Sequence, residues 1–145
     1  MKTIAYAVSL LLIGATATRL IHPRSTKAQS GCSLSSVQGN YGFAESGFYL
    51  ASGNLNLVSA AGRAVADGNG NLMAQETLVA NGNVVQGYQY FGSYTVNPDC
   101  TGSLTTTDGN GNTGHLNFVI TSGGATVQMI ASDSGYNVTG TAYRQ

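Results

Sequence analysis

Apolar and polar residues alternate along most of this chain in short runs, and turns rich in Gly, Asn and Asp separate the runs. The runs begin at Gln38 and recur about every ten to fifteen residues. None of them has the 3.6-residue period of an amphipathic helix over a useful length. A period of two is typical of a strand with one buried face, so the sequence predicts an all-β protein.

About eight strands follow from this pattern, and short connections join them as hairpins. The expected strands cover residues 41–50, 55–66, 72–80, 83–94, 101–107, 115–121, 125–131 and 136–144. A meander of this kind exposes two strand edges unless its first and last strands pair. We therefore expect a single antiparallel meander that closes into a small barrel, with a two-sheet β-sandwich as the alternative.

The dipeptide Asn81-Gly82 predicts the register of the central hairpin. It favours a type I′ turn, because both central residues of that turn need a positive φ. Counting outward from the turn gives the pairs Leu78 with Val85, Glu76 with Gly87, and Leu72 with Phe91.

Alternation then divides the hairpin into two faces. One face carries Leu72, Ala74, Glu76, Leu78, Val85, Gly87 and Phe91, and the other carries Met73, Gln75, Thr77, Val79, Val84, Tyr88, Tyr90 and Tyr94. We expect the first face to point inward, because its apolar residues are aliphatic or Phe. The residues expected to contact an interior ligand are Leu72, Leu78, Val85 and Phe91, together with Tyr41 and Phe43 of the first strand.

The charges are few and unevenly placed. Charged residues make up 8% of the 145 residues, and four of the six Lys and Arg lie in the first 27. The remainder has two arginines against six carboxylates, a formal charge of −4, and no lysine. A basic surface for phosphates is therefore missing, which argues against nucleic acid or an anionic membrane as a partner.

The first 28 residues have the layout of a signal peptide, with cleavage expected after Ala17 or Ala28. The apolar run from Ile4 to Ile13 is too short to span a hydrocarbon core of about 30 Å. We therefore expect a secreted or periplasmic domain of residues 29–145, with no membrane insertion once the leader is removed. Cys32, preceded by Gln29-Ser30-Gly31, also permits a lipoprotein site as an alternative.

Two cysteines, Cys32 and Cys100, most simply form one disulfide in an exported chain. A closed zinc site needs four ligands, so no metal site is expected from them.

The motif Asp-Gly-Asn-Gly-Asn occurs twice, at residues 67–71 and 108–112. Its start resembles a calcium-binding loop, but Leu72 and Thr113 stand where that loop needs Gly, and no helices flank it. Both copies are rich in residues that tolerate a positive φ, so we favour the interpretation that they are hairpin turns.

Glu76 is the first candidate for chemistry, and Glu45 is the second. A carboxyl group inside a small barrel would have its pKa raised by desolvation, which prepares it for proton transfer. An outward, solvated position is the alternative for both. His115 alternates against Leu116 and Phe118, so we expect it at the surface or rim. No nucleophile elbow, phosphate loop or dinucleotide motif occurs, and no cofactor is expected.

Several features together resemble a group of small exported bacterial β-domain proteins of unknown function. They are the leader, Cys32, Asn40-Tyr41-Gly42-Phe43, the motif at 67–71, and the stretch from Tyr94 to Ser103. The resemblance implies export and a compact β domain, and brings no activity. In general organisation the chain is also similar to allene-oxide-cyclase-like and dirigent-like barrels, but no catalytic motif of theirs can be matched to its residues.

The leading functional expectation is a barrel that binds a small, largely apolar molecule in its interior. An isomerase or cyclase that uses Glu76 or Glu45 is one alternative, so whether the protein is an enzyme stays open. A structural or adhesive surface protein is the other alternative. The sequence does not define the oligomeric state.

Overall fold

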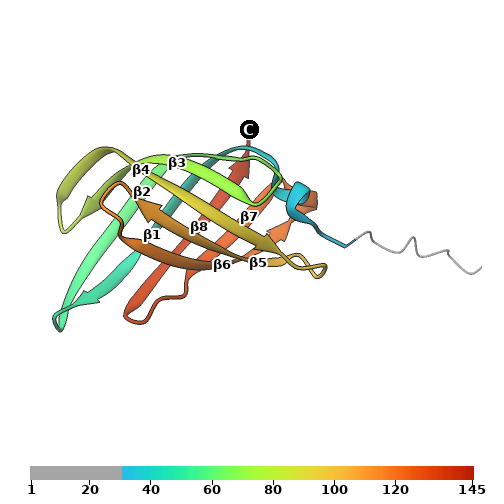
Figure 1. The fold of residues 1–145 in the computed structure, drawn as a ribbon. Helices are drawn as coiled ribbons and strands as arrows, with labels where there is room; N and C mark the ends of the chain where they lie inside the picture. Colours follow the sequence, from blue (N-terminus) through green and yellow to red (C-terminus); the bar gives the residue numbers. More distant parts are fainter. Residues whose placement is uncertain (1–30) are drawn as a thin grey trace, which may run out of the picture.

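The structure is a computed structural model, and it describes residues 31–145. The predicted leader, residues 1–28, lies outside the described part. Eight strands follow one another: β1 (Gly39–Ala51), β2 (Asn54–Ala66), β3 (Asn71–Ala80), β4 (Asn83–Val96), β5 (Thr101–Asp108), β6 (Thr113–Thr121), β7 (Thr126–Ala131) and β8 (Tyr136–Arg144). Each pairs antiparallel with the next, and β8 pairs with β1, so the meander closes into a barrel (Figure 1). The predicted all-β barrel is confirmed.

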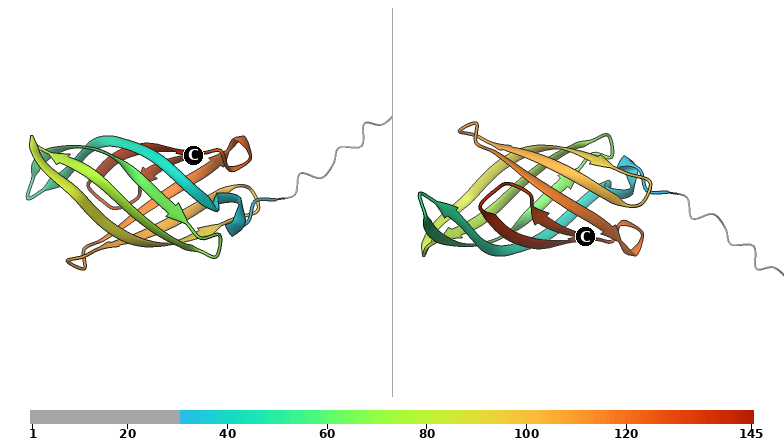
Figure 2. Two further views of the ribbon diagram at one scale, coloured as in Figure 1. Left: turned by 90° about the horizontal axis from the view of Figure 1, so that it is seen from above. Right: turned by 90° about the horizontal axis from the view of Figure 1, so that it is seen from below.

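The barrel has two different ends. The β2–β3, β4–β5 and β6–β7 turns lie at one end, together with the 3₁₀ helices η1 (Leu34–Val37) and η2 (Ser122–Gly124). We call this the plugged end. The β1–β2, β3–β4, β5–β6 and β7–β8 turns lie at the other, which we call the open end. Figure 2 shows η1 against the plugged end and the hairpin tips at the open end.

Helix η1 closes the plugged end because it brings an apolar residue over the interior. Val37 is buried in a cluster with Ala66, Tyr94 and Ile120. Cys32, just before η1, forms a disulfide with Cys100 of the β4–β5 turn, as predicted. Such a bond is typical of proteins that fold in an oxidising compartment.

Small residues on β2 make room for large ones on β1. Tyr41 pairs with Ala64, and Phe43 pairs with Gly62. Both aromatic side chains are buried and belong to one apolar cluster with Ala64. An aromatic ring beside an alanine or glycine can reach toward the centre of the barrel, which fills the interior from one side.

The predicted register of the β3–β4 hairpin holds only near its turn. Asn81 and Gly82 have positive φ values of 48° and 81°, and Leu78 pairs with Val85 as expected. A β-bulge follows, and beyond it Glu76 pairs with Tyr88 and Leu72 with Gly92. The predicted pairs of Glu76 with Gly87 and Leu72 with Phe91 are therefore wrong. Gly87 lies in the bulge with a φ of 68°, a conformation that favours glycine.

The bulge shifts β4 by one residue, and a shift of one residue exchanges the two faces of a strand. Tyr90 and Tyr94 therefore point inward, whereas Phe91 is 60% exposed. Val85, near the hairpin tip, is 46% exposed. The prediction that Val85 and Phe91 face the interior is wrong, while the inward position of Glu76 on β3 agrees with the structure.

Candidate functional site

The interior holds an apolar cavity of about 80 Å³. Tyr41, Phe43 and Leu72, three of the predicted ligand-contacting residues, line it. Tyr90 and Met129 also line it, and sequence reasoning did not find them. Leu78 of β3 is half-buried and does not contribute to the lining, and Val85 and Phe91 are exposed.

A second hollow, of about 670 Å³, is more open to solvent. Glu45, Ala60 and Gly140 are among its lining residues, and Met129 borders both hollows. Strand β7 has six residues whereas β1 and β2 have 13 each, so the wall is lower on the β7 side (Figure 2). The interior therefore changes from an apolar cavity to a wider space that contains a carboxyl group.

Glu76 is a buried polar residue of the barrel wall and does not itself line either hollow. It follows Leu72 and Ala74 on the inward face of β3, between Gly62 of β2 and Tyr88 of β4. Glu76 is only 5% exposed. Among residues 31–145, its Oε2 atom has no hydrogen-bond partner, although it is buried.

Burial raises the pKa of Glu76 to about 7, and the negative charge of Glu45 acts in the same direction. The nearby Tyr90 hydroxyl acts in the opposite direction and lowers this pKa. Burial also raises the pKa of Glu45 above its ordinary value. At neutral pH Glu76 is therefore divided between its protonated and ionised forms, which suits proton transfer.

Two tyrosines of β4 complete the polar side of the interior. Burial, with the nearby carboxyl groups, raises the pKa of Tyr90 far above its usual value, so its hydroxyl stays neutral. The Tyr88 hydroxyl donates to Asp108 Oδ2 at 2.7 Å. Burial and this bond raise the pKa of Tyr88 to about 12. Hydrogen bonds from Asn112 and Tyr88 hold the pKa of Asp108 well below its usual range, so Asp108 is charged.

Sequence reasoning missed Tyr88, Tyr90 and Asp108 as site residues. The signal that could have found the tyrosines is Gly87, because an isolated Gly inside a strand pattern often marks a bulge. A bulge there would have exchanged the faces of β4.

The two Asp-Gly-Asn-Gly-Asn motifs form turns with the same hydrogen bonds. Asp67 Oδ1 accepts from the backbone N–H groups of Asn69 and Asn71, and Asp67 Oδ2 accepts from the Asn71 amide. The second motif repeats all three bonds, with Asp108 as acceptor and residues 110 and 112 as donors. The predicted role of both motifs as turns is confirmed. Residues 31–145 contain no group of three or more His, Cys, Asp or Glu suited to a metal ion.

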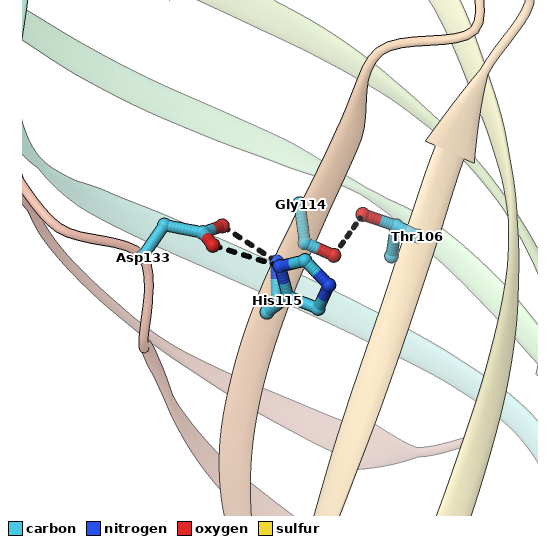
Figure 3. A network of polar contacts seen from close by, with 4 residues as sticks. All are labelled: Thr106, Gly114, His115 and Asp133. Atoms are coloured by element: carbon cyan, nitrogen blue, oxygen red, sulfur yellow. Dashed lines mark hydrogen bonds and ion pairs between the residues drawn. The ribbon is translucent and has the colours of Figure 1, made fainter.

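His115 lies on the outside of the barrel, as predicted (Figure 3). Its Nδ1 atom is 2.7 Å from Asp133 Oδ1, and its backbone N–H donates to Asp133 Oδ2 at 2.7 Å. On the neighbouring strand, the Thr106 hydroxyl donates to the Gly114 carbonyl at 3.3 Å. The His115–Asp133 pair fastens the β7–β8 turn to β6 and makes no contribution to the lining of either hollow.

Comparison of the chain with protein-family models, with curated proteins and with solved structures finds no match in any of the three. The likeness to small exported bacterial proteins stays a prediction. The function is therefore inferred from the chemistry of the barrel interior.

Proposed function

We propose that this protein is a secreted or periplasmic barrel that binds a small, largely apolar molecule in its interior. The observation that carries the proposal is the apolar cavity of about 80 Å³. A single water needs about 10–15 Å³ and two or more polar partners. The cavity is large enough for water but offers few polar partners, so an apolar group is its favoured occupant.

The size of the cavity limits what fits. An apolar cavity of roughly 150 Å³ accommodates benzene. The cavity here, about 80 Å³, suits a short alkyl chain instead. The wider hollow beside Glu45 then receives the rest of the ligand, where its polar end can remain partly hydrated.

Export is part of the proposal. The Cys32–Cys100 disulfide supports it, because disulfides persist in oxidising compartments and are rare in the cytosol. The signal-peptide pattern of residues 1–28 supports it independently.

Calorimetric titration with 1-hexanol tests interior binding. The variant Ala64→Val adds two methyl groups inside, because Ala64 is 8% exposed and lines the cavity. Ala61→Val makes the same change on the exposed face of the same strand. We expect Ala64→Val to weaken binding about tenfold or more, since it removes space for roughly two methylenes. Ala61→Val should bind as the parent does.

Thermal melting of both variants would confirm that they fold. No heat of binding for any linear alcohol from four to eight carbons would contradict the proposal, and so would equal affinity in the two valine variants.

Proton-transfer catalysis is a second candidate, as in an isomerase or cyclase. The specific observation in its favour is that the pKa of the buried Glu76 lies at about 7, where a general acid or base is most effective. Glu76→Gln should lower turnover of an identified substrate about 10²- to 10⁴-fold. Unchanged turnover in the Glu45→Gln, Glu76→Gln double variant would eliminate this candidate.

A further inference from the structure

The interior carboxyl groups have no positive counterpart on the protein. Of the two arginines in the described residues, Arg63 is exposed on the outer face of β2. Arg144 is held at the plugged end, where its guanidinium donates to the Tyr41 hydroxyl and the Ser36 carbonyl. His115 lies outside with its own partner, Asp133. No basic side chain of residues 31–145 therefore neutralises Glu76 and Glu45.

The two carboxyl groups lie on either side of one strand with little between them. Glu45 pairs with Ala60, and Glu76 pairs with Gly62, and both partners are on β2. A Cβ atom at position 62 would collide with the Gln75 carbonyl and with Glu76 itself. Small residues on β2 thus keep the three strands close, so that β2 alone separates the strands that carry the two carboxyl groups.

One carboxyl oxygen of Glu76 lacks a hydrogen-bond donor. Its Oε2 atom is buried and, among the described residues, unpartnered. A buried acceptor without a donor is costly, and charge-assisted hydrogen bonds are the strongest that a carboxylate can accept. The missing partner is therefore a donor, and a positively charged donor would also offset the repulsion between Glu76 and Glu45.

The groups near Glu76 on β4 and β5 do not provide that charge. Tyr90 approaches Glu76 with a neutral hydroxyl, and the Tyr88 hydroxyl is already committed to Asp108. Asp108 itself is negative. Three carboxyl groups and two neutral hydroxyls thus surround one side of the interior, and the apolar cavity lined by Phe43 and Tyr90 adjoins it.

We propose that the interior ligand is a primary amine with a short apolar chain, whose ammonium group lies between Glu76 and Glu45 and whose chain fills the apolar cavity. This inference rests on the proposed binding function and defines its ligand class. An ammonium group presents three donors on a compact charge, enough for both carboxyl groups and a water. An alcohol offers one donor and no charge, and a carboxylate would be repelled.

The test is calorimetric titration of the protein at pH 8 with three ligands of equal chain length: n-hexylamine, 1-hexanol and sodium hexanoate. At pH 8 the alkylamine is protonated and Glu76 is mostly ionised. We expect hexylamine to bind at least about tenfold more tightly than hexanol, because a charge-assisted bond replaces a neutral one. Hexanoate should bind most weakly.

Three variants show whether the preference comes from the proposed residues. Glu76→Gln and Glu45→Gln should each reduce the preference for hexylamine over hexanol several-fold. Asp99→Asn removes the same charge from an exposed turn at the plugged end, so it should preserve the preference. This control separates contact with the carboxyl groups from attraction to a negatively charged protein.

Each outcome has a distinct meaning. Equal affinity for hexylamine and hexanol, or a preference that survives in Glu76→Gln, would overturn the amine inference and leave the binding function standing. Failure of all three ligands to bind would overturn both. An equal loss of preference in Asp99→Asn would show that attraction is only long-range, and would also overturn the inference.

Discussion

The two ends of the barrel treat their buried polar groups in opposite ways. At the plugged end, the Tyr41 hydroxyl donates to the Gly124 carbonyl at 2.8 Å and accepts from Arg144 at 2.9 Å. Toward the open end, Glu76 is equally buried but has an oxygen with no partner in the described chain. A satisfied network stabilises a fold, whereas an unsatisfied buried group is costly and is retained for a reason such as a functional role or a bound partner.

The repeated turn motif makes the contrast sharper, because one copy lies at each end. At the plugged end, the backbone of the 67–71 turn reaches Tyr94, whose hydroxyl accepts from the Gly68 N–H at 3.0 Å. At the open end, Asp108 accepts from the Tyr88 hydroxyl. The same local turn therefore stabilises the plugged end in one place and the carboxyl-rich side of the interior in the other.

The largest expected effect comes from opening the plugged end. The double substitution Cys32→Ser, Cys100→Ser removes a crosslink between residues 68 positions apart. On the chain-entropy view this lowers the free energy of unfolding by about 4 kcal/mol. Urea unfolding of the oxidised parent and the variant measures the difference. A difference in the free energy of unfolding under about 1 kcal/mol would show that the disulfide does not stabilise the plugged end.

A smaller loss is expected when one hydroxyl is removed from the plug network. Tyr41→Phe leaves the Gly124 carbonyl and part of the Arg144 guanidinium without their partner, which should cost about 1–3 kcal/mol in the free energy of unfolding. Tyr143→Phe is the matched control, because Tyr143 is 60% exposed and should change stability very little. Equal urea midpoints for the two variants would contradict the proposed importance of the network.

Toward the open end, Glu76 should make the free energy of unfolding decrease as the pH rises. Burial raises the pKa of Glu76 in the folded state from 4.5 to about 7, so the folded protein binds a proton more tightly than the unfolded chain. This contribution to stability is complete below about pH 4.5 and is lost as the pH rises through 7. Glu76→Gln should abolish this decline and be more stable than the parent at pH 8, on the order of 1–2 kcal/mol after solvent screening.

Asp108 should behave in the reverse manner, because its hydrogen bonds lower its pKa below the ordinary value of 3.8. Its contribution is present at neutral pH and is lost only in acid below about pH 4. Urea unfolding from pH 3 to pH 9 separates the two groups. A parent protein whose stability rises steadily between pH 5 and pH 8 would contradict the position of Glu76.

The smallest effect tests the face assignment of β4. Phe91 is 60% exposed, so Phe91→Ser should change the free energy of unfolding by no more than about 0.5 kcal/mol. Tyr90→Ser, at the inward neighbour, should lower the free energy of unfolding several times more, because it leaves a cavity. If Phe91→Ser were the more damaging change, β4 would have the opposite face inward.

Much of the fold was predictable because it depends on local signals. Two-residue periodicity indicated the strands, the Asn81-Gly82 turn indicated the hairpin, and the cysteine count indicated the disulfide. Helix η1 was missed because four residues, Leu34–Val37, are too few to establish a helical period.

The site was predictable only on one strand. Strand β3 carries no extra residue, so alternation placed Glu76 inward correctly. Strand β4 gains one residue at its bulge near Gly87, which reversed every later position and concealed Tyr88 and Tyr90. A bulge depends on packing with neighbouring strands, so counting from a turn cannot reveal it.

On the proposed function, the barrel interior and not the outer wall accepts the apolar ligand. Methionine methyl groups test it most directly, because Met129 borders both interior hollows whereas Met73 is 54% exposed on the outside of β3. In an NMR titration of ¹³C-methyl-methionine protein with n-hexylamine and with 1-hexanol, we expect saturable shifts at Met129 and none at Met73. Shifts at Met73 with Met129 unchanged, or no shift at either methyl group, would contradict it.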